Sequence, residues 1–407
     1  MELLPVIYLG YMFIAIYLLF VYIILYLNNR KDLFADIESK KKYTISVLVP
    51  AFNEENTIEN TIRAVFKINY PIEELIVIND GSKDKTKEIV ERLLQEFPKL
   101  KVLNKNNSGK ADSLNEGIKI AKGELVVVVD ADSYPAEDSF GKLVGYFKDK
   151  DVGAATCVFV PRNANRFFEK LQDMEYRVIA FTRKLLGYVD AIWVTPGPLA
   201  MYRKSALKKV GGFDKNNITE DIEIAWALTK HGYKRKMSLS TYATTTVPNK
   251  FMAWYKQRRR WNVGGLQCLA KYKKDYFKHG MLGAFILPFF TIQLFLGLLG
   301  LGIGVYVVVK RLLRDFLFAK FSVDVGTPLL TMNDIFVTPS FLNYLGVVIF
   351  IAGLLFTVLV LGIVKSSALK KHNIFDLLFY LIVYLSAYPF IMISAIYNFI
   401  KKKYEWR

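Results

Sequence analysis

The sequence predicts an α/β domain with a mostly parallel, Rossmann-like sheet, flanked by transmembrane and interfacial helices. Between residues 30 and 250, short β-branched runs alternate with stretches of helical periodicity. Strands joined through helices form parallel sheets with both faces covered. Outside that region lie long runs without charged side chains. Roughly 20 apolar residues, at about 1.5 Å per residue, cross a hydrocarbon core of about 30 Å.

The apolar residues are concentrated at the two ends of the chain. Of the 407 residues 53% are hydrophobic, which is more than a soluble core needs. The apolar runs are Leu3–Asn29, Met281–Val309, Phe341–Val364 and Leu377–Ile400. We therefore expect four segments: an N-terminal transmembrane helix at 1–29, a cytoplasmic catalytic domain at 30–250, an interfacial amphipathic region at 251–280 and a C-terminal transmembrane bundle of about three helices at 281–407.

Basic residues predict the side of the membrane on which the domain lies. Arg30 and Lys31 follow the first apolar run, and Lys273 and Lys274 precede the second. Positive residues stay on the cytoplasmic side, so we expect a multi-pass protein of the cell membrane with its catalytic domain in the cytoplasm. Four full spans would leave Lys401–Lys403 outside, together with Arg407, although Lys365, Lys370 and Lys371 would be inside. One interpretation is that Met281–Val309, interrupted by Pro288, is partly interfacial.

The net charge of +18 is explained by anionic lipid headgroups, which attract lysine and arginine at membrane junctions. Nucleic acid is the rival partner, but no base-reading motif accompanies the basic residues. We therefore expect membrane lipids and no nucleic acid as partners. Cys157 and Cys268 lie far apart and without partners at metal-ligand spacing, so we interpret both as packing residues in a reduced compartment.

Polar motifs follow the predicted strands at their carboxyl ends. The predicted strands are Ile45–Val49, Glu74–Ile78, Lys101–Leu103 and Leu125–Val129, with helices at Glu55–Lys67, Asp84–Phe97 and Gly109–Ala121. The motifs Ala51–Glu54, Asp80 and Asp130–Asp132 come directly after three of these strands. Ligands of open α/β sheets bind at that edge, so these motifs predict a binding site.

Asp130-Ala131-Asp132 places two carboxylates on one loop after a buried strand. Alternation directs both toward the same site, and Mg²⁺ typically takes one or two carboxylates together with phosphate oxygens. The motif therefore predicts a metal–diphosphate site, with Asp132 as the direct ligand and Asp130 nearer the nucleoside. Lys110, at the start of a predicted helix, favours an anion; the alternative is a solvated lysine.

Thr219-Glu220-Asp221 opens a predicted helix and offers two adjacent carboxylates. A general base must lie within hydrogen-bond reach of the hydroxyl that it deprotonates, and we choose Asp221, with Glu220 beside it. The structural alternative is that Thr219 caps the helix and the acidic residues favour its dipole.

Gln257-Arg258-Arg259-Arg260-Trp261 combines cations with an aromatic ring. Helical spacing places Gln257, Arg260 and Trp261 on one face, where arginine can hold diphosphate oxygens and tryptophan can face a sugar ring. Arg258 and Arg259 are predicted to turn elsewhere, toward lipid headgroups. The alternative is a basic amphipathic helix whose Trp254, Tyr255, Trp261, Leu266 and Leu269 enter the lipid.

This ordered set of motifs resembles family 2 glycosyltransferases, in particular the membrane-embedded processive synthases of cellulose, chitin, hyaluronan and poly-N-acetylglucosamine. The resemblance covers roughly residues 43–265 and includes Gly109–Asn115, Thr195–Pro198 and Gly211–Phe213. It implies the GT-A fold, an inverting transfer and a Mg²⁺ or Mn²⁺ ion. The residues implied to bind nucleotide-sugar are Pro50, Ala51, Phe52, Asn53, Glu54, Asp80, Lys110, Asp130, Ala131 and Asp132.

The resemblance also implies where the acceptor binds. Gln257, Arg260 and Trp261 would bind diphosphate and acceptor sugar, and Thr195, Pro196 and Gly197 would border the acceptor terminus. We expect transfer from a UDP-sugar, of the UDP-GlcNAc or UDP-glucose type, to the growing end of a β-linked polysaccharide with coupled export. The larger synthases carry more helices, which motivates the alternative of a single transfer to a lipid such as a polyprenyl phosphate or a glycerolipid.

Overall fold

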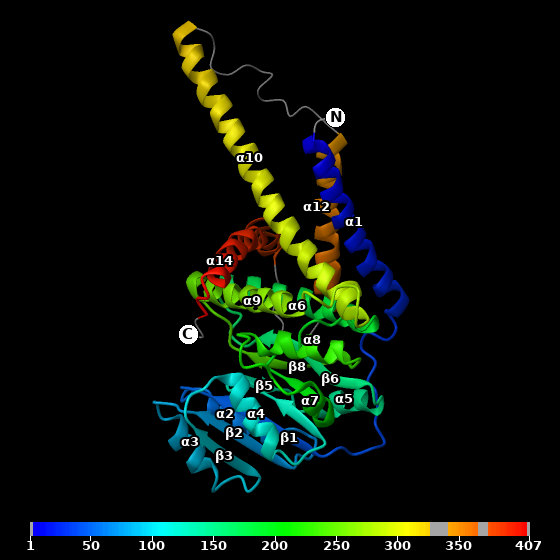
Figure 1. Cartoon of the computed structure of the whole chain (residues 1–407), viewed down its shortest axis with the longest axis vertical. Coiled ribbons are helices and arrows are strands. Elements are labelled where there is room, and N and C mark those ends of the chain that lie inside the picture. Colours follow the sequence, from blue (N-terminus) through cyan, green and yellow to red (C-terminus); the bar gives the residue numbers. More distant parts are fainter. Residues whose placement is uncertain (1–2, 326–340, 365–372, 405–407) are drawn as a thin grey trace.

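The computed structural model describes residues 3–325, 341–364 and 373–404 (Figure 1). The positions Lys365, Lys370, Lys371 and Arg407, which enter the charge argument above, lie outside these residues. The predicted α/β class is confirmed in the part between α1 (Leu3–Asn29) and the C-terminal helices.

One mixed sheet of eight strands forms the domain, in the order β3-β2-β1-β4-β7-β6-β8-β5. The pairs β3-β2, β2-β1, β1-β4 and β6-β8 are parallel, and the other three neighbours are antiparallel. The strands are β1 (Ile45–Ala51), β2 (Glu74–Asp80), β3 (Leu100–Lys105), β4 (Leu125–Val128), β5 (Ser133–Pro135), β6 (Val152–Pro161), β7 (Ala200–Arg203) and β8 (Lys234–Thr245).

Alternation along the strands builds one hydrophobic core on each face of the sheet. Val47 and Val49 of β1 pack with Ile62 in the first core, whereas Leu48 packs with Leu114 in the second. Because helices cover both faces, strands such as β1 are apolar at almost every position. The helices of this domain are α2 (Ile58–Phe66), α3 (Thr86–Leu93), α4 (Lys110–Ile120), α5 (Ser139–Val144), α7 (Lys204–Val210) and α8 (Glu220–Lys230).

The four predicted strands are present, and the predicted helices are present but shorter. The helix expected at Asp84–Phe97 runs only from Thr86 to Leu93. Its start is delayed because the Asp84 carboxylate accepts hydrogen bonds from both the amide (3.0 Å) and the hydroxyl (2.6 Å) of Thr86. Aspartate side chains compete in this way with helical backbone hydrogen bonds, so the helix begins only after Asp84.

Two long helices lie between the sheet and the long apolar helices of the molecule. They are α6 (Phe167–Tyr188) and α9 (Phe251–Tyr272), and α9 contains the cationic motif. In Figure 1, α1, α10 (Leu287–Val325) and α12 (Phe341–Ile363) project away from this layer. The last helix, α14 (Tyr388–Ile400), instead lies beside α9 (Figure 1).

Within the described ranges, four helical segments are long and apolar enough to cross a membrane. The expected interruption at Pro288 is wrong, because α10 is continuous through that residue. Pro288 is the second residue of α10, where an absent amide donor costs little. A π-helical turn at Leu282–Ile286 precedes it.

The broken segment is instead the last one. Between α13 (Ile374–Phe379) and α14 the helical path passes through a π-helical turn at Tyr380–Tyr384 and a 3-10 turn at Leu385–Ala387. Such turns are typical of helices that are bent by specific side-chain contacts.

Candidate active site

A cleft of about 1400 Å³ opens at the carboxyl ends of β1, β2 and β4. It continues past α8 and α9 to side chains of α1, α10 and α14. Drug-sized ligand pockets measure about 300–1,000 Å³, so this cleft can hold more than one small ligand. Every site residue predicted from the sequence lines it except Asn53 and Thr195.

Asn53 is exposed and connects two loops beside the cleft. It adopts a left-handed backbone conformation with φ of 56°. Its side-chain oxygen accepts a hydrogen bond from the amide of Lys83 (2.8 Å), and its own amide donates to the Ser82 hydroxyl (3.0 Å). Asparagine tolerates this conformation better than most residues. Asn53 therefore ties the loop after β1 to the loop after β2.

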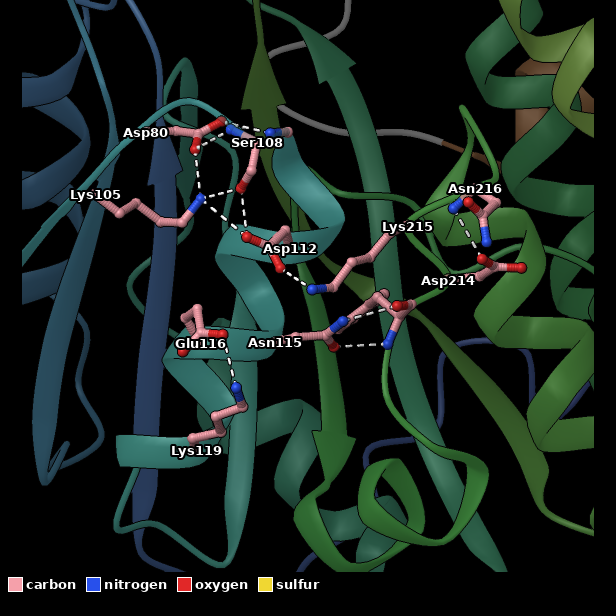
Figure 2. A network of polar contacts seen from close by, with 12 residues as sticks. Asp80, Lys105, Ser108, Asp112, Asn115, Glu116, Lys119, Asp214, Lys215 and Asn216 are labelled. Carbon is pink, nitrogen blue, oxygen red and sulfur yellow. Dashed lines mark hydrogen bonds and ion pairs between the residues drawn. The ribbon is translucent and has the colours of Figure 1, made fainter.

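Asp80 stands at the end of β2, in the wall of the cleft (Figure 2). Its carboxylate accepts hydrogen bonds from the amides of Ser108 (3.0 Å) and Gly109 (2.8 Å) and pairs with Lys105 at 2.7 Å. These three bonds use much of its acceptor capacity. Its carboxylate thus fixes the loop in front of α4.

The same network reaches the segment that precedes α8 (Figure 2). Asp112 pairs with Lys105 at 3.1 Å and also with Lys215, and it accepts a hydrogen bond from the Ser108 hydroxyl. The ammonium of Lys215 and the Ser108 hydroxyl hold the pKa of Asp112 well below its usual value. The charge pairs therefore connect the loop in front of α4 with the loop that leads to Glu220 and Asp221.

Lys110 is the first residue of α4 and bridges two acidic motifs. Its ammonium lies 2.6 Å from the Asp130 carboxylate and 2.7 Å from the Glu220 carboxylate. Burial acts to lower the pKa of Lys110, but Asp130 and Glu220 raise it above its ordinary value. The alternative of a solvated lysine is therefore wrong: this cation stands inside the cleft.

Acidic groups crowd together around Asp132. Burial, followed by the charges of Asp130 and Glu54, raises the pKa of Asp132 to about 6. Within the described residues, no three His, Cys, Asp or Glu side chains form a complete metal cage. Two carboxylates that repel each other still fit a hard divalent ion whose remaining ligands come from a diphosphate.

Asp221 lies on α8 beside Glu220, and the two carboxylates differ in their surroundings. Glu220 is buried and paired with Lys110, whereas the carboxylate of Asp221 accepts a hydrogen bond from the amide of Ile222 (3.0 Å). Burial, followed by the charge of Glu220, raises the pKa of Asp221 to about 7. A carboxylate with this pKa can accept a proton near neutral pH, which suits a general base.

The interpretation that the Thr219 side chain caps α8 is wrong. Its hydroxyl donates to the side-chain oxygen of Asn217 (3.1 Å), and no side-chain hydrogen bond caps the start of α8. Thr195 in turn is buried behind the cleft, where its amide and its hydroxyl each donate to the carbonyl oxygen of Asp221 at 3.2 Å. Thr195 therefore fixes the backbone of Asp221 and does not border the cleft.

Gly197 brings the loop after Thr195 against the acidic cluster. A Cβ atom at this position would lie 2.6 Å from the carboxylate oxygens of Asp130 and 2.6 Å from the ammonium of Lys110. The carbonyl of Gly197 also accepts a hydrogen bond from the amide of Asp130 (3.1 Å). Only glycine allows this approach, and Pro196 and Pro198 line the cleft on either side of it.

The predicted orientation of Arg258 toward lipid headgroups is wrong. Arg258 is fully buried, and its guanidinium pairs with Glu175 of α6, with Nη2 2.5 Å from Oε2. Trp254, which the alternative of an amphipathic helix placed in the lipid, is also fully buried, against α6 and the last helical segment. Sequence spacing did not reveal this, because the partner of Arg258 lies 83 residues away. Gln257, Arg260 and Trp261 do line the cleft.

Several lining residues carry no signal in the sequence. Glu175, Tyr176 and Arg183 lie along one face of α6, and Tyr388 comes from α14. None belongs to a short motif, so only the tertiary structure identifies them.

Part of the chain is similar in sequence to known proteins. Residues 46–211 match the sequence model of the family described as glycosyl transferase family 2. A poly-β-1,6-N-acetyl-D-glucosamine synthase of Staphylococcus epidermidis is 34% identical over 262 residues, 64% of this chain and 64% of that protein. One from Staphylococcus aureus strain MSSA476 is 33% identical over 265 residues, 65% of this chain and 63% of that protein. The similarity thus spans somewhat less than two thirds of these curated relatives.

A solved structure resembles almost the whole chain. It is a mannosyltransferase from Pyrobaculum calidifontis in complex with GDP-Man and Mn²⁺. The TM-score is 0.59, with 97% of this chain and 99% of that chain covered. At 19% identity the likeness concerns the fold alone.

Proposed function

We propose a function from the premise that this chain carries a glycosyl transferase family 2 domain with the predicted GT-A fold. The protein is a membrane-bound, inverting glycosyltransferase that transfers a sugar from a UDP-sugar to the growing end of a β-linked polysaccharide. The names of its relatives support N-acetylglucosamine as that sugar and poly-β-1,6-N-acetylglucosamine as the product.

One observation carries the proposal: the nucleotide end and the membrane end belong to a single cleft. The cleft runs from Asp80 past Asp221 and Trp261 to Tyr11 of α1 and Gln293 of α10. A soluble acceptor would need no exit toward membrane helices. A polymer that is extended at one end and exported at the other needs such a continuous path.

The residues of the cleft suit an in-line transfer. Asp221 takes the proton of the acceptor hydroxyl as its oxygen attacks the anomeric carbon. The bond from that carbon to the diphosphate breaks, and its electron pair leaves with UDP. Lys110 and Arg260 stabilise the charge that develops on the leaving group. Attack opposite the leaving group inverts the anomeric configuration.

Asp130 and Asp132 would hold a Mg²⁺ or Mn²⁺ ion together with oxygens of the diphosphate. Bound there, the ion neutralises phosphate charge and acts as a Lewis acid for the departing UDP. Without nucleotide, the Lys110 ammonium supplies a cation for Asp130 and Glu220.

Purified full-length protein in lipid nanodiscs tests the proposal. We expect UDP-GlcNAc with Mg²⁺ or Mn²⁺ to give a water-soluble polymer of N-acetylglucosamine, sized by gel filtration and identified by mass spectrometry. A labelled sugar that enters only an organic extract would instead support single transfer to a lipid. The synthase relatives do not favour that alternative.

We also propose that only α1, α10 and α12 cross the membrane, and that Ile374–Ile400 lies along its cytoplasmic surface. Contacts with the catalytic part occur along the whole segment. Phe379 contacts Phe167 at the start of α6, with ring centroids 4.9 Å apart. Ala395, near the other end, packs with Ile218 and Val263. A segment held at both ends by the cytoplasmic domain does not cross the bilayer.

This topology removes the charge conflict at the C-terminal lysines, whereas Lys310, Arg311 and Arg314 remain toward the outer end of α10. With three crossings Lys401–Lys403 stay on the cytoplasmic side, as positive residues do. Cys157 and Cys268 are free and buried, so single cysteines introduced at Lys403 and Lys320 report accessibility. In intact cells a membrane-impermeant thiol reagent should label Lys320→Cys but not Lys403→Cys. Labelling of both would restore the fourth span.

A further inference from the structure

A buried polar network joins three helices behind the cationic motif. The Glu175 carboxylate of α6 accepts two hydrogen bonds from Arg258 of α9, at 2.5 and 3.2 Å. It also accepts hydrogen bonds from the hydroxyls of Tyr384, at 2.7 Å, and Tyr388. Four donors therefore meet on one carboxylate, with Glu175 only 5% and Arg258 0% exposed.

Arg258 also contacts two residues that line the cleft, Gln257 and Trp261. Its Nη1 donates to the side-chain oxygen of Gln257 at 2.6 Å. Its guanidinium lies 4.0 Å from the ring centroid of Trp261. Stacking and a charge-assisted hydrogen bond both require the guanidinium plane to be fixed, and Glu175 fixes it by bidentate pairing.

Tyr384 and Tyr388 connect Glu175 to the C-terminal helical segment. Tyr384 ends the π-helical turn, and Tyr388 is the first residue of α14. The two tyrosines are four residues apart, a spacing that places side chains on one face of a helical segment, and both hydroxyls donate to the same carboxylate. Tyr388 also lines the cleft, as do Gln257 and Trp261. The position of α14 therefore depends on the carboxylate that orients Arg258.

We propose that Glu175 is a positioning residue for the acceptor: through Arg258 it orients Gln257 and Trp261, and through Tyr384 and Tyr388 it holds α14 beside them. The proposal rests on the proposed function, because it takes the acceptor to be the growing glycan. Glu175 does not touch the diphosphate side, where Lys110 and Asp130 lie. Its loss should therefore weaken the hold on the glycan and leave donor binding intact.

The test compares Glu175→Gln with wild-type protein in nanodiscs. Glutamine keeps the shape but removes the charge that pairs with Arg258. We expect shorter polymers and a KM for an added β-1,6-linked N-acetylglucosamine oligosaccharide that rises about tenfold or more, since small misplacements of substrate-positioning groups have effects of this order. The KM for UDP-GlcNAc should not change. Tyr388→Phe keeps the ion pair and should shift product length in the same direction, by less.

Asp173→Asn is the matched control. Asp173 is a buried carboxylate on the same helix, paired with Arg177 at 2.7 Å. The Asp173→Asn variant should have a lower unfolding temperature than the wild type but the same product length. Unchanged product length and acceptor KM in Glu175→Gln would overturn the positioning role, as would an equal rise in both KM values.

A measurement without substrate separates this proposal from the proposed function. Thermal unfolding of Glu175→Gln, Tyr388→Phe and the double variant should be non-additive, because both residues belong to one network. Additive effects would contradict the network. A wild-type protein that makes no polymer from any UDP-sugar would refute the proposed function, while the unfolding cycle still reports on Glu175.

Discussion

Gly264 of α9 lies directly against Thr219, the residue before α8. A Cβ atom built on Gly264 would lie 1.8 Å from the Thr219 hydroxyl oxygen. The helix α9, which carries Trp261, therefore packs directly against the turn that presents Glu220 and Asp221. A second contact holds the two helices together: Glu223 of α8 accepts hydrogen bonds from Tyr272 (2.7 Å) and Lys271 (2.5 Å) of α9.

Gly264→Ala should separate α9 from α8. The added methyl group has no room, so we expect a loss of about 1–3 kcal/mol in the free energy of unfolding, as for overpacked sites, and a fall in turnover. Gly265→Ala is the control, since its nearest neighbour outside the helix lies 3.6 Å from the new Cβ. Thermal unfolding and UDP release measure both effects. Equal behaviour of the two variants would show that the close contact is unimportant.

Asp221→Asn should reduce turnover by about 10²–10⁴-fold, the range of a lost general base. The same change should raise thermal stability at pH 8. The folded-state pKa of about 7 exceeds the usual aspartate value, so the folded protein binds more protons than the unfolded chain between about pH 4 and 7. Wild-type stability therefore falls as pH rises through that window, and the asparagine variant lacks this loss. A stability gap that does not grow with pH would contradict the assignment.

The pH dependence of catalysis should follow the same carboxylate. The basic form of Asp221 exists above its pKa of about 7. We expect kcat/KM to rise about tenfold per pH unit below that value and to level off above it, since this parameter reports the free enzyme. A flat profile between about pH 5.5 and 7 would assign the base elsewhere.

Asp132→Ala should abolish metal-dependent binding of the donor. In the free protein Asp132 is crowded by Asp130 and Glu54, which together with burial raise its pKa to about 6. A divalent ion relieves that crowding, so UDP should bind more weakly when a chelator is present. Calorimetric titration of UDP with and without Mn²⁺ measures this. Tight binding of UDP in chelator would argue against a metal at these carboxylates.

Arg183→Met should raise stability while lowering activity. Arg183 lines the cleft at 7% exposure, and burial lowers its pKa to about 10. Among the residues with described coordinates, none forms a hydrogen bond or ion pair with its guanidinium. An unpaired buried charge is costly, so methionine should add about 1–3 kcal/mol to the free energy of unfolding.

Arg177→Met, on the same helix, should have the opposite effect and lower the free energy of unfolding. Arg177 pairs with the buried Asp173, and its loss leaves that carboxylate without this partner. Breaking a buried pair costs about 3–5 kcal/mol, so this variant should be less stable than the wild type. A destabilised Arg183→Met would show that Arg183 has a structural role.

The sequence predicts those parts of the site that follow from the succession of strands and helices along the chain. Asp80 and Asp130 follow buried strands, and parallel strands bring their carboxyl ends to one edge. Lys110 begins a helix that faces the same edge, so its place in the cleft follows from the same reasoning.

Residues whose partners are remote could not be predicted in this way. Arg258 is paired with Glu175, and Thr195 with the backbone of Asp221, across long stretches of chain. Helical spacing states which face a side chain occupies but not what covers that face. The spacing therefore predicts that Arg258 faces lipid headgroups, although the Glu175 carboxylate covers it.

The network around Glu175 also limits how the enzyme can be divided. A truncation that ends before residue 281 would keep Glu175, Arg258 and Trp254 but remove both tyrosine hydroxyls. The buried side chains of Glu175 and Arg258 would then be exposed to water, and the excised fragment would lose the shape of this part of the cleft. Studies of this enzyme in isolation therefore need the hydrophobic tail to be retained.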